Sequence, residues 1–207
     1  RAWHSRVTTA ERQRFLWQPY VPGKTFSIVA VVHEHWIDLW PPAEQKLSAD
    51  GRFEYRGGRI LSDPDQAGVP GLDWNLLEQV VVNLLSGIAG LRGYVGIDLI
   101  AADSEEQLHR EKASTGNSLA RDSATGPRLL AVEINPRLTT SYLGYRQQHR
   151  GCLAERLIND SVCTGQASDP LVSRGSPEDP GDGRKSVLRP DKADWNPLPI
   201  DFTPETI

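Results

Sequence analysis

Two acidic side chains and one amide lie within apolar segments, at positions from which they could bind a metal ion. Asp98 interrupts the segment GYVGIDLIA, and Glu133 and Asn135 close the segment RLLAVEIN. Carboxylate and amide oxygens are the ligands that Mg²⁺ and Mn²⁺ prefer, with water and substrate phosphate completing the octahedron. Arg137 follows two residues later and offers a planar cation that can hold a phosphate or a carboxylate through two hydrogen bonds.

Both segments are predicted to be β-strands, in which successive side chains point to opposite faces. Glu133 and Asn135 then share one face with Ala131. The other face of the same strand contains Leu130, Val132 and Ile134. If the two strands pair as antiparallel neighbours, Asp98 and Glu133 can lie opposite each other. Two opposed carboxylates repel and burial raises their pKa, so a bound cation would remove the conflict.

A purely structural explanation competes with the metal site. Glu133 could form a salt bridge with Arg137, and Asp98 could cap a turn. For either acid alone this explanation is the better one, because single acidic residues at strand ends are usually structural. The combination of two acids, an amide and an arginine favours the metal site.

The elements that must position these residues can be recognised from their hydrophobic patterns. A β-branched, buried strand is predicted over 24–32, and a short partner strand over 36–40. Asp73 is the predicted N-cap of an amphipathic helix. The apolar stripe of that helix is Trp74, Leu77, Val80, Val81, Leu84, Leu85 and Ile88. The segment YRGGR (55–59) predicts either a substrate-binding loop or a plain turn, since glycines let backbone approach a ligand closely.

Composition excludes several classes of protein. The 207 residues fit one domain, or one domain plus a tail, and the net charge of −4 gives no basic surface for nucleic acid or membrane. The sequence contains no apolar run of the ~20 residues that a membrane span needs. Its two cysteines suit neither a metal site nor a disulfide framework, which favours a reducing, cytoplasmic location. The absence of Met leads us to expect a piece of a longer protein.

Two longer motifs resemble the ATP-grasp superfamily. The segments GYVGIDLI and LLAVEINPRLTTSYLG resemble the pair of strands that binds metal in that family. WQPYVPGKTFSIVAVV resembles its interdomain hinge and the strand that follows. The resemblance covers about 17–160, and the EINPR strand is its most specific part. The Leu-Thr-Thr-Ser run after the arginine further resembles a subgroup of carboxylate–amine ligases that includes tyramine–glutamate ligase.

The resemblance implies ATP and Mg²⁺ (or Mn²⁺) as cofactors and assigns roles by position. Arg137 matches the arginine near the transferred phosphate. The implied metal ligands are Asp98, Glu133 and Asn135. The implied hinge residues, whose backbone contacts the adenine edge, are Gln18, Pro19 and Val21. Pro19 departs from the usual Glu or Lys, but a proline keeps its carbonyl, so the backbone contact survives.

The resemblance also implies an architecture, namely an α+β fold with an antiparallel sheet and helices packed on one face. We expect 1–16 to be a remnant of a preceding lobe and 17–160 to be the C-terminal ATP-grasp subdomain, with a mobile loop at 102–128. Residues 161–207 are rich in Pro, Gly, Asp and Ser and predict a largely irregular tail.

The implied reaction is ATP-dependent ligation of a small-molecule carboxylate to an amine through an acyl phosphate. The family encloses ATP between two lobes, so the expected partner is the missing N-terminal lobe, and the fragment alone is expected to be inactive. The alternative is a non-catalytic nucleotide-binding or interaction module, either a decayed ligase lobe or one that depends on a partner.

Overall fold

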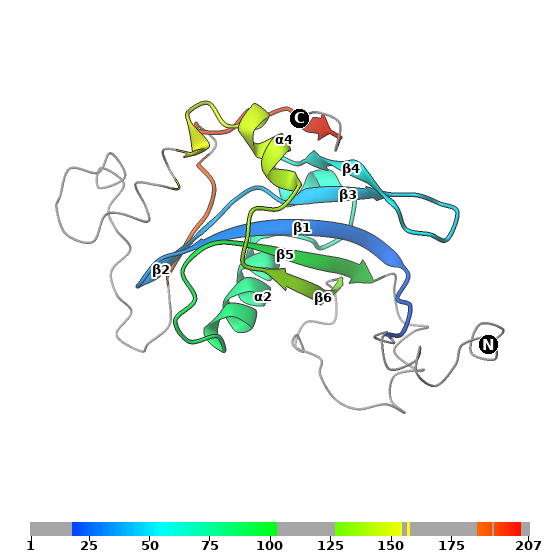
Figure 1. The fold of residues 1–207 in the computed structure, drawn as a ribbon, viewed down its shortest axis with the longest axis horizontal. Helices are drawn as coiled ribbons and strands as arrows, with labels where there is room; N and C mark the ends of the chain where they lie inside the picture. The colour runs from blue at the N-terminus through cyan, green and yellow to red at the C-terminus, as the bar shows by residue number, and fades with distance from the viewer. Residues whose placement is uncertain (1–17, 103–126, 155–156, 158–185, 192, 204–207) are drawn as a thin grey trace.

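The computed structural model of the protein describes residues 18–102, 127–154, 157, 186–191 and 193–203. These residues form one eight-stranded sheet with a helix over each face (Figure 1). The strands are β1 (Gly23–Val32), β2 (Trp36–Leu39), β3 (Ala43–Leu47), β4 (Tyr55–Ile60), β5 (Gly93–Ala102), β6 (Arg128–Asn135), β7 (Ser186–Leu188) and β8 (Ile200–Phe202). The helices are the 3₁₀ turn η1 (Pro64–Ala67), α2 (Trp74–Ser86) and α4 (Ser141–Gln148).

The sheet is organised around β1. Its main path runs β6-β5-β1-β3-β4-β8, and every pair along this path is antiparallel. β2 pairs with the end of β1 and, in parallel, with β7. β1 pairs with β5 over its whole length, which places the predicted site strands β5 and β6 at one side of the sheet.

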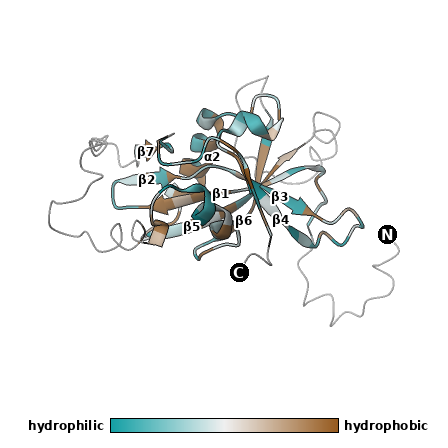
Figure 2. Ribbon diagram, turned by 90° about the horizontal axis from the view of Figure 1, so that it is seen from above, coloured by the Kyte–Doolittle hydropathy of each residue, from teal (hydrophilic) through white to brown (hydrophobic). Residues whose placement is uncertain are grey.

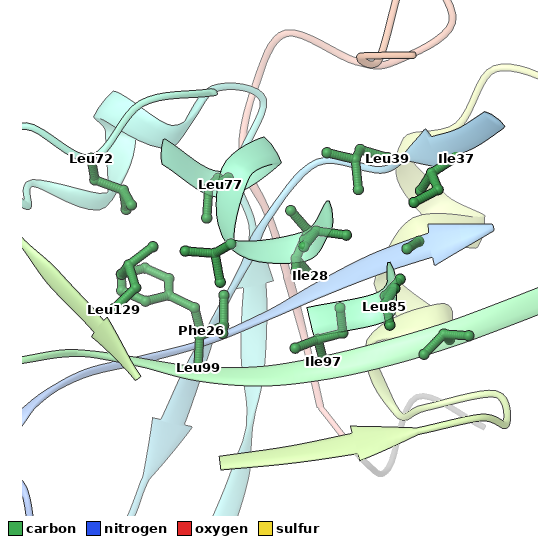
Figure 3. Close-up of a cluster of buried hydrophobic side chains, with 14 of the residues drawn as sticks. Phe26, Ile28, Ile37, Leu39, Leu72, Leu77, Leu85, Ile97, Leu99 and Leu129 are labelled. Carbon is green, nitrogen blue, oxygen red and sulfur yellow. The ribbon is translucent and has the colours of Figure 1, made fainter. Parts of the chain in front are cut away.

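One face of the sheet packs against α2 (Figure 3). Phe26 and Ile28 of β1 lie opposite Leu99 and Ile97 of β5, and all four side chains are buried against the apolar stripe of α2. The helix begins where predicted, since the Asp73 side chain accepts a hydrogen bond from the backbone N–H of Leu76 at 2.8 Å. This cap satisfies one of the donors that a helix start leaves free.

The other face of the sheet packs against α4 and the C-terminal residues. Alternation along β1 turns Val29 and Val31 to this side, where they join a second buried cluster that contains Trp40, Tyr145 and Trp195. The predicted α+β class with an antiparallel sheet is confirmed. The helices are divided between the two faces, with α2 on one side and α4 on the other (Figure 1).

The C-terminal residues add two short strands to the sheet. The tail was predicted to be largely irregular, with docking of Trp195 on the domain left open, and residues 186–203 contribute β7 and β8, with the side chains of Trp195 and Phe202 each 3% exposed. A Cβ on Gly57 would meet the Phe202 backbone, and one on Gly144 would meet its ring. The paired glycines of YRGGR thus lie within β4 and admit the tail strand β8. A short segment that cannot fold alone can still pack on an existing core in this way.

Several expectations fall on residues outside the described ranges. These are the N-terminal remnant at 1–16, nearly all of the loop at 102–128, and 161–185 of the tail. The division of the chain into a remnant, a subdomain and a tail therefore stays a prediction. Within the described ranges, no helix is both long enough and apolar enough to cross a membrane.

Candidate functional site

The two acids lie opposite each other on neighbouring antiparallel strands, as predicted. In the register of β5 and β6, Asp98 pairs with Glu133 and Gly96 pairs with Asn135. By alternation along β5 these residues lie on the face that bears α4. The α4 helix packs against β4 and β8, whereas Asp98 is only half-buried and Glu133 is exposed.

A β-bulge at Val132 decides which face each residue of β6 occupies. Asp98 pairs with Glu133 but its neighbour Leu99 pairs with Ala131, so Val132 is an extra residue in β6. Simple alternation predicted that Leu130 and Val132 share a face with Ile134, which packs against the core in the structure. Instead Leu129 is buried in the core and Val132 is 47% exposed. The bulge thus shifts the first half of β6 while Glu133 stays on the site face.

Asp98 is held from both sides by amide groups. The Gln45 side-chain N–H donates to Asp98 Oδ1 at 2.8 Å, and that of Asn135 donates to Oδ2 at 3.2 Å. Burial, and then the charge of Glu133, raise the pKa of Asp98, while Gln45, Arg137 and Asn135 act in the opposite direction. Part of this rise in the pKa of Asp98 thus comes from the repulsion that was expected between the two opposed carboxylates.

Gln45 and Tyr55 belong to this site but were missed by the sequence analysis. Gln45 lies on β3 and donates to Asp98 from beyond β1, whereas Tyr55 lies on β4 and is linked to Asp98 through its charge. Burial, and then Asp98, raise the pKa of Tyr55 to about 12, so its phenol is neutral near pH 7. The strand that contains Gln45 was not predicted, because the residues of β3 show no clear hydrophobic pattern, so no signal in the sequence pointed to Gln45.

The competing structural explanation does not match the geometry. Asp98 lies inside β5 and does not cap a turn. Glu133 and Arg137 both lie in the described part of the chain, and they form no ion pair with each other there. The Arg137 guanidinium instead donates to the carbonyl of Leu138 at 3.4 Å. The backbone N–H of Arg137 donates to the Asn135 carbonyl at 2.8 Å, which turns the chain sharply just after β6.

The loop after β6 lies over β5 because Gly96 has no side chain. A Cβ on Gly96 would overlap Cγ2 of Thr139. The Thr139 hydroxyl also lies 2.9 Å from that of Tyr94 and 2.8 Å from that of Ser141 at the start of α4. This network fixes the segment that contains Arg137 between β6 and α4.

The donor set at Asp98 and Glu133 suits an oxygen-bound divalent cation. Two carboxylates from paired strands and the buried amide of Asn135 meet there, and these are oxygen ligands of the kind that Mg²⁺ and Mn²⁺ prefer. The described residues contain no group of three or more His, Cys, Asp or Glu that could hold a metal ion. A metal at this place would therefore depend on Asn135 as well as on the acids.

The predicted hinge lies directly before β1. Gln18 and Pro19 are exposed and Val21 is half-buried, and between them Tyr20 stacks on Phe53 with ring centroids 5.5 Å apart. Ser27 of β1 pairs with Asp98 of β5 and lies four residues after Gly23, where β1 begins. At a rise of about 3.3 Å per residue, the start of β1 is therefore roughly 13 Å along the strand from the level of Asp98. The hinge roles remain predictions.

The sequence matches the family model of the ATP-grasp domain over residues 2–141. This match covers more than half of the chain, and the chain therefore belongs to the ATP-grasp family. No curated protein sequence matches it. The narrower resemblance to carboxylate–amine ligases stays a prediction.

Similar solved structures include a protein from Archaeoglobus fulgidus that is described as a member of the ATP-grasp superfamily. It is 21% identical over 68% of this chain and 36% of its own, with a TM-score of 0.44. N5-carboxyaminoimidazole synthetase from Staphylococcus aureus, in complex with ADP, is 13% identical over 68% of this chain and 30% of its own, with a TM-score of 0.45. The chain spans about a third of the length of these structures.

Proposed function

We propose that this chain forms the metal-binding half of the ATP site of an ATP-dependent ligase. The observation that carries the proposal is the pairing of Asp98 with Glu133 on the solvent-accessible part of the sheet, beside the Asn135 amide, in a chain of the ATP-grasp family. Like charges directly opposite each other destabilise a sheet, and a cation bound between the two acids would remove this cost.

In this proposal each side chain has a defined task. Asp98, Glu133 and Asn135 hold Mg²⁺ or Mn²⁺, which neutralises phosphate charge when it is bound. Arg137, exposed on the turn after β6, binds the oxygens of the phosphate that is transferred. The backbone of the hinge residues Gln18, Pro19 and Val21 contacts the adenine edge.

The proposed chemistry has two steps. A carboxylate oxygen of the substrate attacks the γ-phosphorus, the bond to ADP breaks, and an acyl phosphate forms. An amine nitrogen then attacks the acyl carbon, loses a proton, and displaces inorganic phosphate to leave an amide. The residues described here contribute by positioning and by charge, which supply most of the catalysis in phosphoryl transfer.

The proposal extends to partners and location. Because the chain spans about a third of the similar structures, we propose that a preceding lobe covers the phosphates and excludes water. The substrates are a small-molecule carboxylate and an amine, and the proposed location is cytoplasmic.

An assay of ADP release by the full-length protein tests the function. Glu133→Gln conserves shape but removes one negative charge, so ADP formation should fall by at least 100-fold while the fold is kept. Glu54→Gln is the matched control, since Glu54 is an exposed acid just before β4 that pairs with Arg56. Unimpaired turnover by Glu133→Gln would remove Glu133 from the mechanism. Tight ATP binding without turnover by the wild type would favour the non-catalytic alternative.

A further inference from the structure

Gln45 contacts Asp98 from a strand that the sequence motifs of the site do not include. Its side-chain N–H donates to Asp98 Oδ1 at 2.8 Å, although β1 separates β3 from β5. The strand between them presents the small, buried Ser27 opposite Asp98, which leaves room for the longer glutamine side chain. The hydroxyl of Thr25 donates to the Gln45 carbonyl at 3.2 Å and fixes the backbone of β3 beside β1.

We propose that Gln45 is a positioning residue that orients the Asp98 carboxylate for a divalent cation. This inference rests on the proposed function and deepens it. Gln45 does not itself bind the metal. It acts through Asp98 by fixing the Asp98 carboxylate in one orientation. Gln45 approaches this carboxylate from β3, whereas Glu133 lies on β6, on the other side of β5.

The count of lone pairs supports this role. A carboxylate has about four acceptor positions, two on each oxygen. Gln45 occupies one on Oδ1 and Asn135 occupies one on Oδ2, so each oxygen keeps one position for a cation or for water. Groups that orient metal ligands in this way commonly change metal affinity by 10–100-fold when they are removed.

Gln45 could also serve only the stability of the fold, and the test must separate the two roles. A hydrogen bond to a charged group is worth about 1.5–3 kcal/mol, so its loss alone can lower the melting temperature. A merely structural glutamine would change the melting temperature without changing the affinity of the folded protein for metal. A positioning glutamine would change the affinity, and only while Asp98 is present.

The experiment measures Mn²⁺ affinity of the full-length protein, with and without ADP, from the electron paramagnetic resonance signal of free Mn²⁺. Gln45→Leu removes the amide at similar volume, and Gln45→Met is the second variant should the first not fold. Either change should raise the Kd for Mn²⁺ about tenfold. Lys46→Gln, the neighbouring change on β3 at an exposed residue paired with Asp201, should leave the Kd unchanged.

A double-mutant cycle with Asp98→Ala decides whether Gln45 acts through Asp98. In that background Gln45→Leu should produce no further rise in the Kd. A further tenfold loss there would overturn the proposal, and so would an unchanged Kd for both single variants of Gln45. If the wild type binds no Mn²⁺ at all, the proposed function fails, and this inference fails with it. Binding by the wild type that is insensitive to Gln45 refutes the inference alone.

Discussion

The face of the sheet that bears α4 has two halves of opposite character. The sealed half is closed by aromatic side chains from distant parts of the chain, and its members are Trp40, Tyr145, Trp195 and Phe202. The open half is polar and keeps access to solvent, and its members are Gln45, Asp98, Glu133 and Asn135. The two halves share the same strands, since β1 contributes Val29 and Val31 to the first and Ser27 to the second.

The difference separates what stabilises the fold from what the proposed site requires. The sealed half buries apolar area, and the Tyr145 hydroxyl within it donates a hydrogen bond of 2.6 Å to the Pro41 carbonyl. The open half retains two opposed acids, and like charges directly opposite each other in a sheet are generally destabilising. Proteins tolerate such local conflicts mainly at functional sites.

The largest expected effect is on the sealed half. Trp195→Ala removes a buried ring that stands 5.8 Å from both Trp40 and Tyr145, between ring centroids. Large-to-small changes of this kind cost about 3–5 kcal/mol, so the melting temperature should fall by about 10 °C. Thermal denaturation followed by circular dichroism measures this. An unchanged melting temperature would show that the C-terminal residues do not stabilise the domain.

A smaller loss of stability is expected from a change at Gly144, where the sealed half is tightly packed. A Cβ on Gly144 would lie 2.5 Å from the Phe202 ring and 2.7 Å from Ile60. Overpacking costs about 1–3 kcal/mol, partly offset by the helix propensity of alanine. Gly144→Ala should therefore lower the melting temperature by about 4 °C. Gly87→Ala is the matched control, because nothing lies within 4 Å of its Cβ, and it should not destabilise the protein. Equal melting temperatures for the two variants would contradict the packing.

The open half should respond in the opposite direction. Glu133→Gln removes one of two opposed charges, and such pairs are worth about 0.2–1 kcal/mol. The melting temperature of the metal-free protein should therefore rise by about 1–3 °C, in the same variant that loses ADP formation. Calorimetry in EDTA measures the rise, with Glu54→Gln as the control. A clear fall would mean that Glu133 stabilises the fold and that its charge is already compensated.

The smallest expected effect is a dependence of this gain on pH. Burial and Glu133 raise the pKa of Asp98 in the folded state above its ordinary value of 3.8. The folded state therefore binds the proton more tightly than the unfolded state, and this group contributes stability at low pH that is lost as pH rises through the raised pKa. The advantage of Glu133→Gln should be greatest near neutral pH and should shrink as the pH falls through that value. A constant advantage at every pH would refute the coupling.

The sequence was sufficient where one physical pattern dominates. The β-branched run of β1, the apolar stripe of α2 after Asp73, and the strands β5 and β6 were all predicted close to their observed bounds. Alternation also allowed Asp98 to lie opposite Glu133 if the two strands pair as antiparallel neighbours, and the structure has that pairing. These features depend on local periodicity, and a single sequence contains that information.

Other features depend on contacts between distant residues and could not be predicted. β3, with the sequence AEQKL, shows no clear alternation and is largely hydrophilic (Figure 2), and it becomes a strand because β1 and β4 pair with it. β7 and β8 have three residues each and pair with β2 and β4. For the same reason Gln45 was missed, since its contact with Asp98 spans 53 positions of the chain.

The bulge at Val132 also affects how the protein behaves among copies of itself. β6 ends the sheet, and on its outer side no strand of the described residues pairs with it. A straight edge strand with free backbone groups is a template for strands of other molecules, and bulges are one of the devices that prevent such pairing. The extra residue that keeps Glu133 on the site face therefore also makes β6 a poor surface for aggregation.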